Sequence, residues 1–145
     1  MKAKTLNEWI AFYEEKTGEK FKPHPSFKLL YFPKRGFCEI SLEPKTKMVI
    51  AYQLCGDGHF WKDLLDSFTK LLGFTHGGAI CVRSIVPYIR YWGFRIDQTI
   101  RLPNGQNQYF CINRYGEKAR CSPAWLKEGG EYAYFVTWEV KKCET

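Results

Sequence analysis

The sequence predicts an α+β fold in one domain, with helices packed around a central, mostly antiparallel sheet. Three observations carry this prediction. The chain has 145 residues, which is the length of one domain. Its apolar and charged fractions, 45% and 26%, are those of globular proteins and exclude a disordered chain or a coiled coil. Segments with the helical period of about 3.6 residues alternate with segments that have the strand period of about two.

The first helix is predicted over residues 6–17. Thr5 and Glu8 have the spacing of a capping box, and Gly18 follows as a residue that ends helices. Apolar and aromatic runs bounded by turns with proline then predict three strands. The turns between them are short, which favours antiparallel pairing. These strands are expected over 27–32, 36–42 and 48–54.

The second half of the chain begins with an amphipathic helix over 60–72, which Gly73 ends. A strand over 79–83 and a short helix over 85–92 follow. Pro87 falls in the first turn of that helix, where proline is tolerated. The last predicted elements are a hairpin of strands over 94–102 and 107–114, a loop over 115–129 and a final strand over 131–140.

The composition indicates a partner that carries phosphate. The net charge is +7 and the aromatic share is 17%. The charge is +4 over residues 1–47, +3 over 48–114 and zero over 115–145. No run of like charge forms a tail, so we expect an anion site to be part of the fold.

The six cysteines follow no pattern of a disulfide framework or a metal site. No C-x-x-C pair occurs, and no histidine stands at zinc-ligand spacing beside them. The first residues lack the apolar stretch of a secretion signal, and no run approaches about eighteen apolar residues. We therefore expect a soluble cytoplasmic protein with free thiols in its strands, no metal and no membrane partner.

One segment, Gln53-Leu54-Cys55-Gly56-Asp57-Gly58, predicts a specific chemistry because it joins a strand directly to an amphipathic helix. Its two glycines permit positive φ and close backbone approach, so amides from about residue 55 to 60 can point into one concavity. Together with the positive end of the helix, they would form a cradle for a pyrophosphate. The basic residues expected to flank it are Lys62, Arg83 and Arg90.

The hexapeptide resembles the Q/R-x-x-G-x-G/A motif of the GNAT N-acetyltransferase superfamily, in which the loop holds the pyrophosphate of acetyl-coenzyme A. Residues 85–95, IVPYIRYWGFR, resemble the short fourth helix of the family, which ends in Gly-Phe. Residues 101–114 resemble its closing hairpin. The resemblance covers about residues 27–114.

The resemblance implies a GNAT-like fold and an N-acyltransferase, which would move an acetyl group from acetyl-coenzyme A, or another acyl-CoA, to an amine by direct attack. The strands over 48–54 and 79–83 would be parallel neighbours that splay apart, with the pantetheine arm between them. The cofactor-binding residues that the resemblance implies are Gln53, Leu54, Cys55, Gly56, Asp57, Gly58 and His59.

Direct attack needs a base for the ammonium proton, and an acid can protonate the leaving thiolate. In the family a tyrosine often serves as the general acid, and its position here is Ile89. The neighbouring Tyr88 lies about 100° away around the helix. Either Tyr88 acts through an irregular helix or no such acid is used. Glu39 and His59 are the candidate bases, and each also fits a solvated surface side chain. The candidates at the mouth of the strand pair are Tyr52 and Ser84.

Asp57 departs from the family pattern, because a carboxylate in a phosphate loop opposes pyrophosphate binding unless it turns to solvent. This departure and the basic charge leave an alternative open: a divergent GNAT-like protein that modifies or binds nucleic acid, for example by DNA base modification, without acetyl-CoA. A third interpretation is a non-catalytic interaction module. In the leading interpretation the acceptor is a small-molecule or macromolecular amine.

Overall fold

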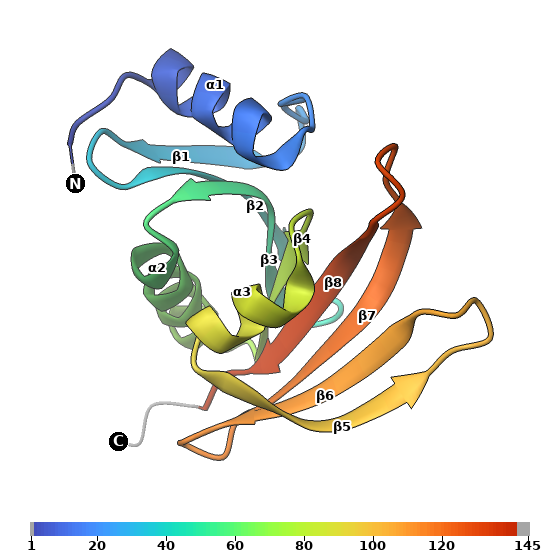
Figure 1. Cartoon of the computed structure of the whole chain (residues 1–145). Helices are drawn as coiled ribbons and strands as arrows, with labels where there is room; N and C mark the ends of the chain where they lie inside the picture. The colour runs from blue at the N-terminus through green and yellow to red at the C-terminus, as the bar shows by residue number, and fades with distance from the viewer. Residues whose placement is uncertain (1, 142–145) are drawn as a thin grey trace.

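The computed structural model describes residues 2–141 and confirms the α+β class: these residues form one eight-stranded sheet and three helices (Figure 1). The sheet order is β1-β2-β3-β4-β8-β7-β6-β5, antiparallel at every pairing except β3 with β4. The helices are α1 (Leu6–Thr17), α2 (Gly58–Leu71) and α3 (Ile85–Tyr91). The strands are β1 (Lys28–Phe32), β2 (Gly36–Glu43), β3 (Met48–Gly56), β4 (His76–Cys81), β5 (Phe94–Arg101), β6 (Asn107–Asn113), β7 (Lys118–Leu126) and β8 (Tyr132–Glu139).

Helix α1 begins and ends where the sequence predicts. The Thr5 hydroxyl accepts from the Glu8 amide at 3.1 Å, and the Glu8 carboxylate accepts from the Thr5 amide at 2.9 Å, which completes the capping box. At the other end Gly18 has a left-handed backbone with φ 70°, and its amide donates to the Glu14 carbonyl. Local sequence therefore sets both ends of this helix.

The helices lie on both faces of the sheet. Phe37, on β2, belongs to a small cluster with Trp9 and Tyr13 of α1, whereas its neighbour Cys38 belongs to the large core that includes Trp61 of α2. Adjacent strand residues point to opposite faces, so α1 covers the face of β2 and β3 opposite α2 and α3 (Figure 1).

The prediction of a loop over 115–129 is wrong, because β7 occupies most of it. Its inward residues, Ala119 and Cys121, are small and buried, while Lys118 and Arg120 point outward. Such an alternation of small and charged residues lacks the β-branched pattern that identifies strands in a sequence. Pro123 is accommodated because the pairing of β7 with β8 shifts register between Pro123 and Trp125.

The hairpin of β5 and β6 lies at the far edge of the sheet and does not pair with β4. The neighbour of β4 is β8, whose residues lie beyond the segment that resembles the GNAT family. Strand β4 also begins three residues earlier than predicted, at His76. The start of the strand was not predicted because it contains two glycines, Gly77 and Gly78, which are rare in strands. A Cβ on Gly77 would lie 2.4 Å from the Trp138 ring, so only a glycine fits beside that side chain.

Strands β3 and β4 separate where β3 contains a bulge. Their parallel pairing runs from Met48–His76 to Ala51–Ala79 and then stops. At the same point the pairing of β3 with β2 passes from Ala51 to Gln53, so Tyr52 is the extra residue of a bulge. A bulge bends its strand, and β3 therefore leaves β4 before either strand ends. The sequence-based expectation of a parallel pair that splays apart agrees with this geometry.

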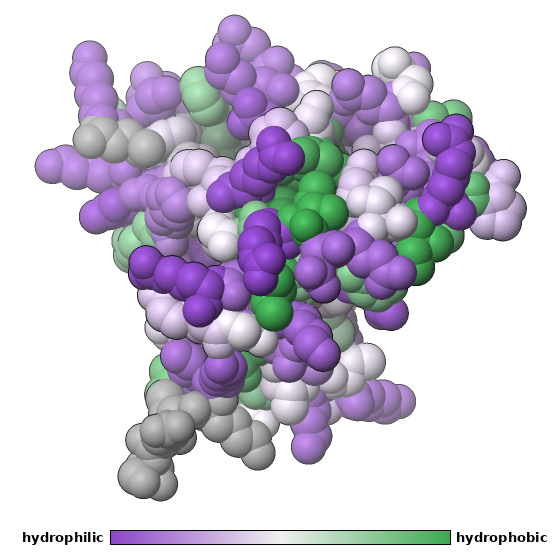
Figure 2. Space-filling model, turned by 60° about the horizontal axis from the view of Figure 1, so that its bottom comes forward, coloured by the Kyte–Doolittle hydropathy of each residue, from purple (hydrophilic) through white to green (hydrophobic). Residues whose placement is uncertain are grey.

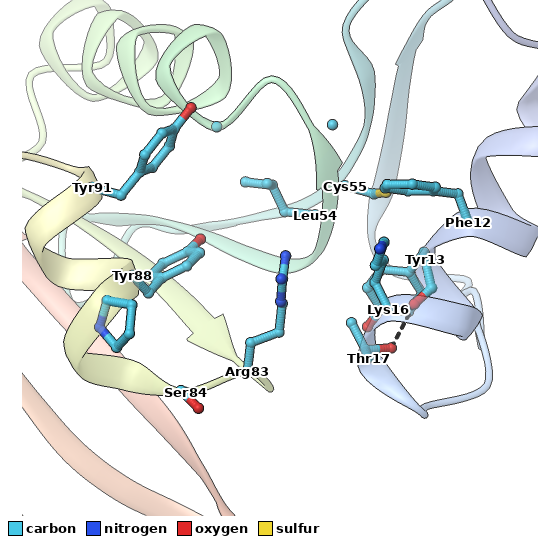
Figure 3. Close-up of a pocket in the computed structure, with 13 residues that line it drawn as sticks. Phe12, Tyr13, Lys16, Thr17, Leu54, Cys55, Arg83, Ser84, Tyr88 and Tyr91 are labelled. Atoms are coloured by element: carbon cyan, nitrogen blue, oxygen red, sulfur yellow. Dashed lines mark hydrogen bonds between the residues drawn. The ribbon is translucent and has the colours of Figure 1, made fainter.

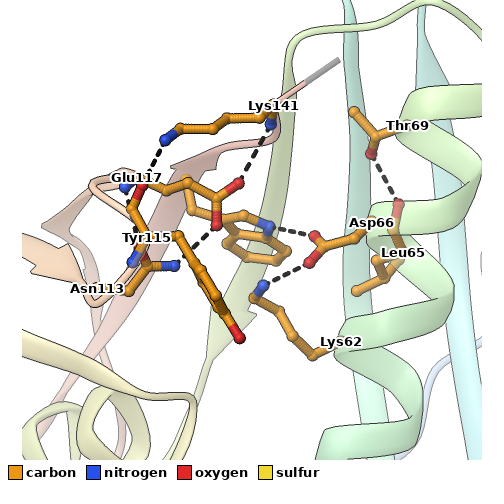
Figure 4. Close-up of polar contacts among 9 residues, drawn as sticks. Lys62, Leu65, Asp66, Thr69, Asn113, Tyr115, Glu117 and Lys141 are labelled. Carbon is orange, nitrogen blue, oxygen red and sulfur yellow. Dashed lines mark hydrogen bonds and ion pairs between the residues drawn. The ribbon is translucent and has the colours of Figure 1, made fainter. Parts of the chain in front are cut away.

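A buried polar cluster ties α2 to β8 on the other side of the core. The Asp66 carboxylate accepts from Lys62 Nζ at 2.6 Å and from the Trp138 indole at 2.7 Å (Figure 4). Lys62 is only 9% exposed, and its ammonium also lies over the rings of Phe94 and Trp138. Lys62 thus holds the core together and does not flank the glycine loop, contrary to the expectation from sequence.

Gly36 and Gly56 form a contact that no other residue permits, and replacing either is expected to destabilise the fold. Both have positive φ, and an added Cβ would lie 1.9 Å from the Cys55 carbonyl oxygen or 2.2 Å from that of Arg35. We expect Gly36→Ala and Gly56→Ala each to lower the free energy of unfolding by about 3 kcal/mol, measured by urea denaturation.

The control is Gly73→Ala, where φ is also positive but nothing lies within 4 Å of the added Cβ. It should cost only the backbone strain, about 1 kcal/mol. Equal losses in all three variants would show that close approach of the backbones is not the cause.

Candidate functional site

A cavity of about 610 Å³ opens where β3 and β4 separate. One wall comes from the last turns of α1, and the other from α3 and the segment before it (Figure 3). The end of β3 and the glycine loop form the back. The residues that line it are Phe12, Tyr13, Lys16, Thr17, Leu54, Cys55, Gly56, Gly58, Arg83, Ser84, Pro87, Tyr88 and Tyr91.

The charged side chains of this cavity are both cations. Arg83 follows β4 and points into the space between α3 and α1, and Lys16 faces it from the last turn of α1 (Figure 3). No carboxylate lines the cavity among residues 2–141. Helix α2 adds the positive end of its dipole through Gly58. The cavity is therefore electrostatically suited to an anion.

Two tyrosines supply hydroxyl groups at the walls. The Tyr88 hydroxyl points into the cavity from α3, and Tyr13 lies on the opposite wall (Figure 3). Burial raises the pKa of Tyr13 to about 12 and that of Tyr88 well above its ordinary value. Both phenols therefore remain protonated at neutral pH. Ile89, the residue at the family's tyrosine position, is buried in the core.

The glycine loop forms a smaller amide cradle than expected. The Asp57 amide donates to the Arg35 carbonyl at 2.9 Å, and the Phe60 amide donates to the Asp57 carboxylate at 3.1 Å. Because α2 begins at Gly58, the amides of Gly58 and His59 have no acceptor within the helix. Of these two residues only Gly58 lines the cavity, so the loop offers the Gly58 amide to a ligand.

The Asp57 side chain is directed away from the cavity. It caps α2 through the Phe60 amide and forms an ion pair with Arg35. The hydrogen bond from Phe60 and the Arg35 guanidinium lower the pKa of this carboxyl. The carboxylate does not line the cavity, which removes the repulsion that the sequence leads one to expect.

His59 and Tyr91 form an aromatic pair beside the first turn of α2. Their ring centroids are 4.0 Å apart with an interplanar angle of 29°. Tyr91 is 49% exposed and lies so close to Gly58 that a Cβ there would be 2.8 Å from its ring. Of this pair only Tyr91 lines the cavity.

Three other candidates from the sequence lie outside the cavity. Glu39 is buried, and its carboxylate accepts from the His24 amide at 2.8 Å and from Gln53 Nε2 at 3.0 Å. Gln53 also bonds both backbone groups of Lys22, so this pair fixes the segment after α1 to the sheet. Tyr52 stacks on Phe27 with centroids 4.2 Å apart.

Several of the residues singled out in the sequence line the same cavity. These are Leu54, Cys55, Gly56, Gly58, Ser84 and Tyr88, together with Arg83. The sequence did not predict that α1 forms a wall of the cavity. The apolar face of this helix indicates that it packs on the sheet, but it does not indicate which cavity the last turn borders. The basic residue Arg90 lies on α3 outside the cavity.

No family model matches this chain, and neither a curated protein nor a solved structure matches it. Within residues 2–141, no helix has the length and apolarity needed to cross a bilayer. The same residues contain no group of three His, Cys, Asp or Glu side chains placed to hold a metal ion. The five cysteines among them are free and buried in strands; Cys143 lies outside the described residues.

The cap on α2 gives a prediction about stability and pH. Asp57→Ala should lower the free energy of unfolding by about 1 kcal/mol at neutral pH, and Asp57→Asn, which keeps a capping oxygen, by less. The pKa of Asp57 is lower in the folded than in the unfolded chain. The carboxylate therefore stabilises the fold fully at pH values above the unfolded-state pKa. This contribution is lost as the pH falls through the folded-state pKa. Urea denaturation should therefore separate wild type from Asp57→Ala at about pH 7 but much less at about pH 3. A gap that stays constant over this range would contradict the role of the charged carboxylate.

Proposed function

We propose that this protein is a GNAT-type N-acyltransferase that uses acetyl-CoA or another acyl-CoA and passes the acyl group to an amine. The observation that carries the proposal is the separation of β3 from β4 over a cavity whose charged side chains are both cations. A volume of about 610 Å³ is in the range of sites for small ligands. Coenzyme A carries phosphates and an extended, amide-containing arm, and each part has a counterpart in this cavity.

The phosphates are matched by the cationic side chains of the cavity. Arg83, Lys16 and the amide of Gly58 would hold a pyrophosphate, because each supplies a donor or a positive charge.

The arm is matched by the unpaired strand edges. Beyond Ala51 and Ala79 the backbones of β3 and β4 no longer bond to each other, so their polar groups are free to pair with the amides of an extended ligand. Leu54 and Phe12 provide apolar surface beside them.

Tyr88 is the residue that we assign as the general acid. When bound, an acyl-CoA supplies an activated thioester carbonyl. The Tyr88 hydroxyl points into the cavity and, as a phenol, is protonated at neutral pH, so it can give a proton to a departing thiolate. Within the described residues no histidine or carboxylate lines the cavity, so we infer that water takes the proton of the amine.

Binding is tested by isothermal titration with acetyl-CoA. Arg83→Gln should weaken binding about tenfold, because it removes a charge-assisted contact to phosphate. The matched control is Arg90→Gln, which removes the same charge from a residue of α3 outside the cavity. Absence of binding by the wild-type protein at millimolar acetyl-CoA would overturn the proposed function. Equal losses in the two variants would reject the assigned site.

Turnover is tested by the variant Tyr88→Phe, which keeps the ring and removes the hydroxyl. With a panel of amines and release of free thiol as the readout, this change should lower kcat about 100-fold and leave acetyl-CoA binding unchanged. Tyr13→Phe, on the opposite wall, is the comparison and should retain most of the activity. An unchanged kcat in Tyr88→Phe would remove Tyr88 from the chemistry.

A further inference from the structure

The strands β4, β8, β7, β6 and β5 have one face that points away from α2 and α3. Within residues 2–141, no helix covers this face. Phe94, Cys111, Ala119 and Trp138 point into the core from successive strands of this part of the sheet. Their neighbours in sequence therefore point to the opposite side. We call this side the open face. Figure 2 shows the molecule from below the view of Figure 1, where β5 and β6 lie. On this side apolar side chains are surrounded by hydrophilic ones.

Strand register arranges the open face in rows, since directly paired residues lie on the same face. In the first row Ile112 pairs with both Arg95 and Lys118. In the second row Phe110 lies between Gln98 and Arg120. The next row contains Gln108, Ser122, Phe135 and Ile80, with Gln108 Nε2 donating to the Ser122 hydroxyl at 2.9 Å.

The cations of the open face are exposed and uncommitted. Arg95, Lys118 and Arg120 take part in neither of the ion pairs that residues 2–141 contain. Two carboxylates lie near this group: Glu139 accepts a hydrogen bond from the Lys118 amide at 3.0 Å, and Asp97 is the unpaired residue at the bulge of β5 between Ile96 and Gln98. Three cations thus surround a half-buried apolar centre of Ile112 and Phe110.

The charge decides which partner fits. A second copy of the chain would place the same cations against each other, on a protein that already carries +7. A partner must supply negative charge along the rows and flat apolar groups over Phe110 and Ile112. Single-stranded nucleic acid has phosphates for the cations and unpaired bases that stack on an aromatic ring, whereas a duplex keeps its bases inside.

We propose that the open face binds single-stranded nucleic acid through Arg95, Lys118 and Arg120, with Phe110 as the stacking ring. This binding is separate from acyl transfer, because the face lies on the side of the sheet away from α3 and does not border the cavity. It accounts for basic residues that a coenzyme would not contact.

The test is fluorescence anisotropy of a labelled oligo-dT with the full chain over a salt series. The variant R95Q/K118Q/R120Q should bind at least about tenfold more weakly at low salt. Its plot of log affinity against log salt should be shallower by about 2, since each phosphate contact contributes about 0.7 to the slope. Phe110→Ala should weaken binding at least about fivefold without changing the slope.

The control is K20Q/K34Q/K70Q, which removes the same charge from exposed lysines outside the open face. Near-ultraviolet circular dichroism verifies that each variant remains folded. The proposal is overturned if the control loses as much affinity as the open-face variant, or if the wild type does not bind. It is equally overturned if a duplex binds more tightly than the single strand, if polyglutamate competes as well as the oligonucleotide, or if sedimentation shows that the face joins two copies of the chain.

Discussion

The bulge at Tyr52 is the constraint on which the arrangement of the site depends. One extra residue in β3 reverses which face its following residues meet, so Ala51 and Leu54 both pack toward the large core while Cys55 faces α1. The same residue bends β3 away from β4. The space between the two parallel strands begins where this bulge coincides with the end of their pairing.

The glycine contact fixes the other end of that space. Gly36 and Gly56 bring the backbones of β2 and β3 together at the point where β3 enters α2, so the first turn of α2 is held beside the cavity. The fold therefore requires a glycine at position 56 whether or not a phosphate binds there. Asp57 also has a structural role, since it caps α2 and pairs with Arg35. The residues that resemble a binding motif also build the strand-to-helix connection, and this connection forms part of the cavity lining.

Local patterns predicted the elements well, because the signals that define them are local. The capping box at Thr5, the strand-to-helix turn at Gly58 and the hairpin turn at Gly105 all have neighbours within a few residues that determine their geometry. The strand over Lys118–Leu126 was missed because its inward side chains are small, and the larger residues beside them, such as Trp138 opposite Ala119, belong to the neighbouring strand β8.

The sequence by itself determined the α+β class, the helix over Leu6–Thr17 and a glycine loop that leads into a helix, since each depends on residues close together in the chain. Only the tertiary structure decided which strand lies beside β4, that α1 forms a wall of the cavity, and that Arg83 and Lys16 face the same space. These outcomes depend on contacts between residues far apart in the sequence. Their energies come from burial and packing in three dimensions, which a one-dimensional pattern does not record.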